Sequence, residues 1–505
     1  MKKFVVLLFI AGVGLGGCKK SLDINQNPNQ PTQVTPSVVL SAALAGSAAN
    51  MAQDYLNLNR WMGYWSRSGN YVPDVQTETY AIPNDYTDFE WSNIYTTINR
   101  YVYIQNAGRQ QQLPFYIGVA KVMMAMHFAT LVDLYNDVPY TNALNVTKTV
   151  TPSYDKGQAI YNDLINEIDS SVIYFDSAKI YYETAPSAVV TTDNQQDIMF
   201  GRIYGSSSDR MDAWVRFANT LKLKLLLHEQ KVVDPADVTA EIAKITNNGR
   251  GFIEAGESAA VNPGYTNSTG QINPFYALFH TVSAATTNVA YYRANSYAIN
   301  FYNNTGDERQ FFFYNPVGNA VLGNCDGDPN SVSNANTSPI GDGLLKSPSQ
   351  DQLILSDFES LFLQAEAAQL GWITGDPETF YESAITQNYV YLNEGVNLTS
   401  DPAGDAKAYY TSGIANADWN ASTDKMQAIL TQKWASLNGI DWVEAYDDYR
   451  RTGIPPLPLS CATTHVEPQI PVRFLYPQVE FNTNGANVPQ LGANAQFTAK
   501  VFWNQ

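Results

Sequence analysis

Residues 356–392, SDFESLFLQAEAAQLGWITGDPETFYESAITQNYVYL, decide the fold of this chain. Apolar residues recur at helical spacing in the first half of the stretch and again in the second half. These positions are Phe358, Leu361, Ala365, Ala368 and Trp372, then Phe380, Tyr381, Ala384 and Ile385. Gly375-Asp376-Pro377 lies between the two runs and is typical of a turn. The stretch therefore predicts two helices joined by a tight connection.

Two interpretations of this helix pair are possible. Small alanines that face a neighbour, a glycine turn, and then an aromatic residue with alanine are typical of a tetratricopeptide pair. No strict period of about 34 residues is visible elsewhere in the chain, however. An ordinary helical hairpin explains the same residues equally well.

Helical spacing also occupies most of the remaining chain. The clearest stripe covers residues 115–129 and stops near Asp137-Val138-Pro139, because proline has no N–H to donate. Further helices are expected at 38–61, 88–109, 156–179, 209–231, 235–246, 423–437 and 441–449. Residues 249–350 are instead rich in Gly, Pro, Asn and Ser, which predicts ordered loops with a few short strands. We therefore predict a mainly α fold, with a helical body and a loop-rich, irregular second half.

Composition excludes one class of partner. The chain has 505 residues, with 30 Lys and Arg against 48 Asp and Glu, and a formal net charge of −18. Binding to nucleic-acid phosphates needs a basic surface, so nucleic acid is not expected as a partner. Only 15% of the residues are charged, and 32 are tyrosines. Such a surface suits neutral polar ligands.

The N-terminus has the pattern of an exported lipoprotein. Lys2 and Lys3 precede an apolar run shorter than the ~20 residues of a membrane span, and Gly16-Gly17-Cys18 follows. This resembles a lipobox, in which cleavage exposes Cys18 for acylation with chains such as palmitate. We expect a signal peptide at 1–17 and an extended tether at 18–36. A plain secretion signal with a chance cysteine is the alternative.

Motifs for catalysis and metal binding are not recognisable. The four histidines lie far apart, and neither G-x-S-x-G nor a phosphate-binding loop occurs. Asp326-Gly327-Asp328-Pro329-Asn330 begins like a calcium loop, but Ser331 and Thr337 replace the required glycine and carboxylate, which favours an Asx-rich turn. We expect no catalytic residue, metal or cofactor. A glycoside hydrolase stays an alternative, because 48 acidic residues offer many carboxylate pairs.

Cys325 and Cys461 are the cysteines left after Cys18. An oxidising compartment would allow them to form a disulfide. Two independent small apolar side chains are an equally good interpretation, because 135 intervening positions say nothing about the distance between them.

Two aromatic clusters indicate a ligand-binding surface. Residues 61–95 are rich in Trp and Tyr and residues 291–297 in Tyr, and Pro73 and Pro83 favour loop structure in the first cluster. Exposed rings can contact the apolar face of a sugar, while neighbouring amides and carboxylates bind its hydroxyl groups. Rings that pack loops onto the helical body are the alternative. The residues expected to bind ligand are Trp65, Asn70, Tyr71, Asp74, Tyr80, Tyr291, Tyr292, Arg293 and Tyr297.

Several separated segments form one ordered pattern along the chain. After the lipobox come Leu22-Asp23-Ile24-Asn25 and Asn27-Pro28, then residues 133–140 (DLYNDVPY) and 214–223 (WVRFANTLKL). Ala365-Glu366-Ala367, residues 449–453 (YRRTG) and residues 471–477 (PVRFLYP), with Glu480 and Asn482 beyond, complete the set. They follow one another in order over nearly the whole mature chain, and together they resemble the SusD/RagB family of surface lipoproteins.

The resemblance implies a single SusD-like domain over residues 37–505, with tetratricopeptide-like helix pairs and a loop-rich insertion at about 249–350. It also implies lipid anchoring at the outer membrane of a Gram-negative bacterium, exposure at the cell surface, and a SusC-like TonB-dependent transporter as partner. The expected function is the capture of oligosaccharides, without catalysis, for delivery to that transporter. Peptide capture is the alternative. Because ligand contacts vary within the family, the aromatic residues above rest on their chemistry alone.

Overall fold

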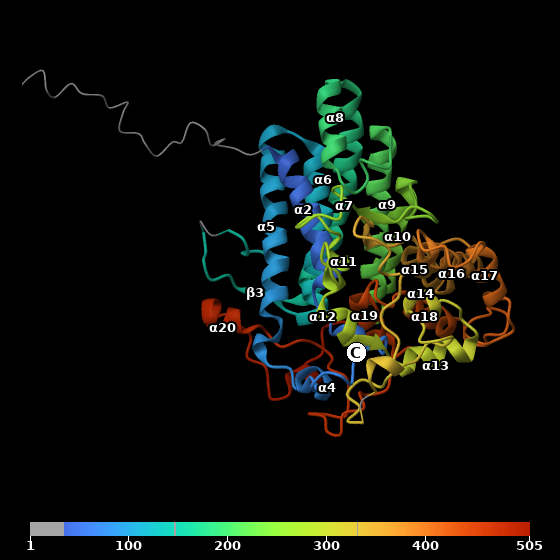
Figure 1. Cartoon of the computed structure of the whole chain (residues 1–505). Coiled ribbons are helices and arrows are strands. Elements are labelled where there is room, and N and C mark those ends of the chain that lie inside the picture. The colour runs from blue at the N-terminus through green and yellow to red at the C-terminus, as the bar shows by residue number, and fades with distance from the viewer. Residues whose placement is uncertain (1–34, 146–147, 331, 505) are drawn as a thin grey trace, which may run out of the picture.

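The computed structural model describes residues 35–145, 148–330 and 332–504. The signal peptide, Cys18 and the tether up to residue 34 lie outside the described residues. The body consists of long helices that run side by side (Figure 1). They are α2 (Pro36–Gln53), α5 (Asp88–Gln111), α6 (Pro114–Tyr135), α7 (Gly157–Thr184), α8 (Ser187–Gln196), α9 (Ser207–His228) and α10 (Pro235–Asn248). Helix α5 packs on α6, α6 on α7, α7 on α9, and α2 on α5.

Helix α6 is the central element of this body. It is apolar on nearly all sides, and a helix of that kind has to be covered by protein or lipid. Among the described residues it is the one helix long and apolar enough to cross a membrane. Neighbouring helices bury 89% of its apolar window, which is the pattern of a core helix. The predicted stop before Asp137 is confirmed, because α6 ends at Tyr135.

The predicted helix pair at 356–392 is confirmed. Helix α15 (Asp357–Gln369) packs on α16 (Pro377–Asn393), and α16 packs in turn on α17 (Pro402–Tyr410). The Ser356 hydroxyl caps α15 by accepting from the Glu359 amide, and Asp376 caps α16 in the same way. Helices α18 (Lys425–Ser436) and α19 (Trp442–Thr452) complete this half. The mainly α class is therefore confirmed.

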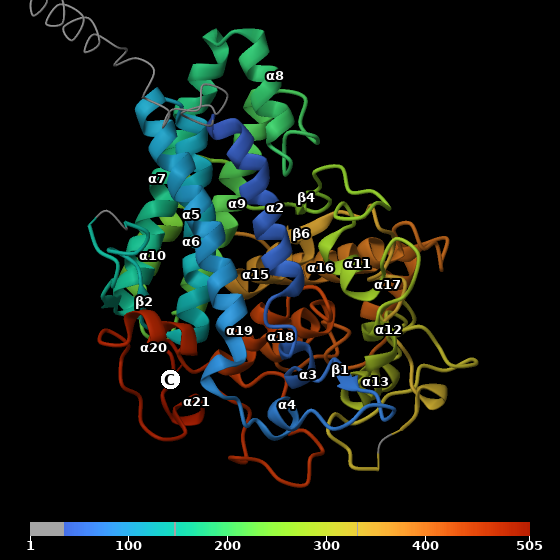
Figure 2. The same ribbon diagram turned by 60° about the vertical axis from the view of Figure 1, so that its left-hand side comes forward.

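Strands are few and short, as predicted. They form three antiparallel pairs: β1 (Trp65–Arg67) with β5 (Tyr292–Ala294), β2 (Val138–Pro139) with β3 (Tyr154–Asp155), and β4 (Ala259–Val261) with β6 (Gln352–Leu355). The short helices are α3 (Leu58–Trp61), α4 (Val75–Thr79), α11 (Pro274–Phe279), α12 (Thr287–Tyr291), α13 (Ser296–Thr305), α14 (Gln310–Phe313), α20 (Gln478–Asn484), α21 (Ala495–Thr498), and the 3-10 turns η1 (Asn84–Thr87) and η2 (Asn334–Asn336). Elements α4, β1, α12 and α13 gather at the end of the molecule away from α8 (Figures 1 and 2).

The structure corrects two predicted segments. The helix expected at 38–61 ends at Gln53, because Asp54 is extended and Tyr55 is left-handed with a φ of 55°. The indole of Trp442 fixes this turn by donating to the Asp54 carbonyl at 2.9 Å. Helix α13 lies inside the block expected to hold loops and strands.

The structure also shows which of the two interpretations of Cys325 and Cys461 holds. Cys325 and Cys461 form a disulfide, with their Cα atoms 5.9 Å apart. The bond joins the loop-rich block to the C-terminal segment. Nearby, Asp328 accepts from the Asn330 amide at 2.7 Å, which confirms the Asx turn.

Candidate functional site

Strands β1 and β5 bring the two aromatic clusters together. Trp65 pairs with Ala294 and Arg67 with Tyr292 in an antiparallel register. Just beyond the paired ends, the rings of Tyr71 and Tyr291 meet edge to face with centroids 5.2 Å apart. Both tyrosines are half-buried, and the neighbouring Asn70 is exposed. We call the surface of Asn70, Tyr71, Asp74 and Tyr291 the aromatic face.

Several residues expected on this surface are buried instead. Trp65 has no exposed surface, because its ring packs on Phe275 and Phe279 of α11 and on Tyr292. Arg293 is 7% exposed, and its Nε donates to the Asn334 Oδ1 at 2.8 Å. The prediction that Trp65 and Arg293 are exposed to ligand is therefore wrong. Sequence spacing near residue 65 gives no sign that α11, more than two hundred residues later, covers this strand.

A buried arginine, not expected from the sequence, underlies the aromatic face. Arg60 Nη1 donates to the Asp74 Oδ2 at 2.6 Å and to the Tyr291 hydroxyl at 3.3 Å. Its Nε donates to the Asp326 Oδ1 at 2.9 Å, and its Nη2 to the Glu78 Oε1 at 3.1 Å. Burial would raise the pKa of Asp74, but the Arg60 charge and the Thr77 hydrogen bond lower it below its usual value. Asp74 therefore stays ionised beside the rings.

A pocket opens next to the aromatic face. It has a volume of about 170 Å³, and its walls come from α3, from α13 and from the loop at residues 458–460. Tyr80 and Tyr297, both expected to bind ligand, line this pocket; Tyr80 belongs to its buried floor, whereas Tyr297 is half-buried. Other lining residues include Arg60, Trp61, Asn295, Asn300, Asp326, Leu459 and Ser460. Of these, Trp61 and Asn295 carried a sequence signal, since they lie in the first and second aromatic clusters.

The disulfide holds one wall of this pocket. The Cys461 amide donates to the Asp326 carbonyl at 2.6 Å, and the Ser460 amide donates to the Tyr80 hydroxyl at 2.9 Å. Leu459 and Ser460 are thereby placed opposite α13. Segments near residues 60, 300 and 460 thus form one site.

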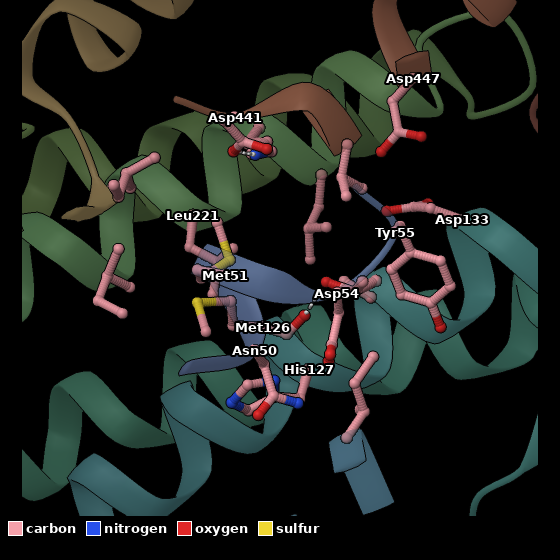
Figure 3. A pocket seen from close by; sticks show the side chains of 18 of the residues that line it. Asn50, Met51, Asp54, Tyr55, Met126, His127, Asp133, Leu221, Asp441 and Asp447 are labelled. Carbon is pink, nitrogen blue, oxygen red and sulfur yellow. Dashed lines mark hydrogen bonds and ion pairs between the residues drawn. The ribbon is translucent and has the colours of Figure 1, made fainter. Parts of the chain in front are cut away.

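A second cavity lies inside the helical body, between α2, α6, α9 and α19 (Figure 3). Its volume of about 60 Å³ holds a handful of water molecules at roughly 10–15 Å³ each, and no sugar ring. Asp54 lies near Met126 in its middle, and Asp133 faces Asp447 at one end. The carboxylates of this cavity therefore do not form a glycosidase site in this structure.

Asp133, His228 and Asp447 lie close enough together to hold a metal ion. Each is already engaged by protein: Asp133 accepts from the Trp503 indole at 2.8 Å, His228 contacts Glu444 at 3.1 Å, and Asp447 pairs with Arg450. Burial alone would lower the pKa of His228, but Glu444 and Asp133 raise it to about 10. A metal ion would have to displace this proton and these protein partners. The cluster is a buried ion-pair network.

Comparison with known proteins identifies the family. Residues 28–477 match a sequence model named SusD-like and described as starch-binding associating with outer membrane. The chain belongs to this SusD-like family. No curated protein matches it.

Solved structures share the SusD-like fold at low sequence identity. An outer-membrane protein of Bacteroides vulgatus ATCC 8482, with a suggested part in nutrient binding, is 20% identical; the match covers 94% of this chain and 100% of that one, with a TM-score of 0.74. A SusD homologue of Bacteroides fragilis NCTC 9343 is 19% identical, with coverages of 94% and 100% and a TM-score of 0.73. A chitin-binding SusD homologue of Flavobacterium johnsoniae is 20% identical, with coverages of 92% and 98% and a TM-score of 0.72.

Proposed function

We propose that this SusD-like protein captures oligosaccharides at the aromatic face and delivers them to a SusC-like TonB-dependent transporter. A lipid on Cys18 would hold it at the outer surface of the outer membrane. The observation that carries the binding role is the convergence of two distant aromatic segments on one surface, through the β1–β5 pairing. The family is described as starch-binding, and one homologue of known structure binds chitin, which supports a carbohydrate ligand.

The aromatic face has the chemistry that a sugar needs. The half-buried rings of Tyr71 and Tyr291 present apolar surface, and Asn70 is exposed at the edge of the face. Asp74 is ionised and about one-third exposed, so its carboxylate can accept from a sugar hydroxyl. The Arg60 network fixes Asp74 and Tyr291 relative to each other before ligand arrives. Such preorganisation lowers the entropy cost of binding.

Removing either ring should weaken sugar binding. We expect Tyr71→Ala and Tyr291→Ala each to lower the affinity for maltoheptaose or chitohexaose about five- to tenfold, because one stacked ring contributes roughly 1 kcal/mol. Tyr71→Phe should bind nearly as well as the unmodified protein, since it keeps the ring. Titration calorimetry measures all three constants.

Tyr103→Ala on α5 is the matched control, because Tyr103 is a 38% exposed tyrosine of the helical body. Its affinity should match that of the unmodified protein. Unchanged binding in both Tyr71→Ala and Tyr291→Ala would remove the aromatic face as the ligand site.

A further inference from the structure

The pocket beside the aromatic face is large enough for one sugar unit. Its volume of about 170 Å³ equals roughly a dozen water-sized sites, which is close to the number of heavy atoms in a whole hexose unit. Tyr297 and Leu459 form half-buried walls, and Asn300 is exposed at its edge. The buried floor includes Arg60, Tyr80 and Asp326. A pocket with a buried floor admits the end of a chain more readily than its middle.

The pocket and the aromatic face share one side chain. Arg60 Nη1 contacts Asp74 and Tyr291 on the side of the face. Its Nε contacts Asp326, which lines the pocket. The two parts are therefore neighbours across a single guanidinium group, and one ligand can occupy both.

The guanidinium groups of Arg60 and Arg67 are already paired with carboxylates of the protein. Arg60 donates to Asp74, Glu78 and Asp326, while Arg67 donates through Nε to Glu78 and through Nη1 to the Ser68 carbonyl. Two guanidinium groups thus face three carboxylates, which leaves one net negative charge. An acidic sugar would find both guanidinium groups of this network paired with carboxylates and would be repelled by the surplus carboxylate. Arg293, the other cation near Tyr71, is 7% exposed and donates to Asn334.

We propose that the pocket binds the terminal unit of an uncharged saccharide, while the aromatic face binds the units that follow. This inference rests on the proposed function and adds to it the kind of ligand and the direction of binding. The ring of Tyr297 would contact the apolar face of the terminal unit. Asn300 and Ser460 would bind its hydroxyl groups, as amides and hydroxyls commonly do in sugar sites.

The test uses four probes on the mature protein: linear maltoheptaose, linear chitohexaose, β-cyclodextrin, which has no chain ends, and an oligogalacturonate of similar length. Asn300→Trp should fill the mouth of the pocket and lower the affinity for the tighter linear neutral probe at least tenfold. Asn304→Trp is the control, because Asn304 is also exposed on α13 and does not line the pocket. The affinity of the Asn304→Trp variant for this probe should stay within twofold of that of the unmodified protein. The oligogalacturonate and the β-cyclodextrin should each bind at least tenfold more weakly than that linear probe.

Equal binding of the linear probe by the protein and its Asn300→Trp variant would overturn the pocket assignment. Equal affinity for the oligogalacturonate would overturn the preference for uncharged ligands, and equal affinity for β-cyclodextrin would overturn chain-end binding. In each of these cases, reduced binding by Tyr71→Ala and Tyr291→Ala would leave the proposed function standing. Failure of all four probes to bind would overturn both proposals.

Discussion

Replacing Arg60 with methionine should lower the free energy of unfolding by about 3–5 kcal/mol, because it leaves buried carboxylates without their partner. Arg60 is 4% exposed and contacts Asp74, Glu78 and Asp326. Glu78 and Asp326 are each buried as well. Once the guanidinium is gone, each carboxylate must take up a proton or admit water. Denaturation with urea, followed by intrinsic fluorescence, measures the change.

Arg109→Met is the control for this experiment, since Arg109 is exposed in the last turn of α5. It should cost less than about 1 kcal/mol. The loss in unfolding free energy for Arg60→Lys should fall between those of the other two variants. Lysine keeps the positive charge but lacks the planar guanidinium that can donate to several carboxylates at once. A loss below about 1 kcal/mol for Arg60→Met would show that the network does not organise this end of the molecule.

Replacing Asp54 with asparagine should stabilise the protein, and increasingly so as pH rises. Burial raises the pKa of Asp54 from 3.8 to about 8, and Glu90 adds to the shift, although a hydrogen bond from Asn93 opposes it. The folded state therefore keeps a proton that the unfolded chain releases between about pH 4 and 8. In this range the carboxyl group lowers stability as pH rises.

Asparagine resembles the protonated carboxyl group and can still accept from Asn93, which lies 3.2 Å from the Asp54 Oδ1. The difference in unfolding free energy between Asp54→Asn and the unmodified protein should be near zero at pH 4 and reach about 5 kcal/mol at pH 8. Asp85→Asn, at an exposed position, should show no such trend. A difference that does not grow with pH would mean that Asp54 is ionised and stabilised in the folded protein. Thermal or urea unfolding across this range decides between the two.

The helical body could be predicted from the sequence because its signals are local. The stripe at 115–129 and the pair at 356–392 each needed only the spacing of apolar residues within one segment. Helix α13 was missed although its caps are also local: Asn295 accepts from the Tyr297 amide, and Gly306 ends the helix in the left-handed region. Its surroundings are rich in Asn and Ser, and that composition was interpreted as loop.

The site could be predicted only in outline. Both aromatic clusters were found, and the structure places them side by side. Which rings face solvent depends on elements far away in the chain, as the burial of Trp65 under α11 shows. The partners of Arg60 lie between 14 and 266 positions away, so no local pattern could reveal that network. The same holds for the pocket, whose walls join three distant segments.

Equilibrium dialysis of the mature protein against neutral oligosaccharides, with the recovered sugar analysed by chromatography, tests the central claim most directly. Passive glycan capture predicts a saturable excess of at least one linear oligosaccharide on the protein side, recovered at its original chain length. Saturable binding of oligopeptides with none of sugars, or recovery of shortened sugars, would contradict it.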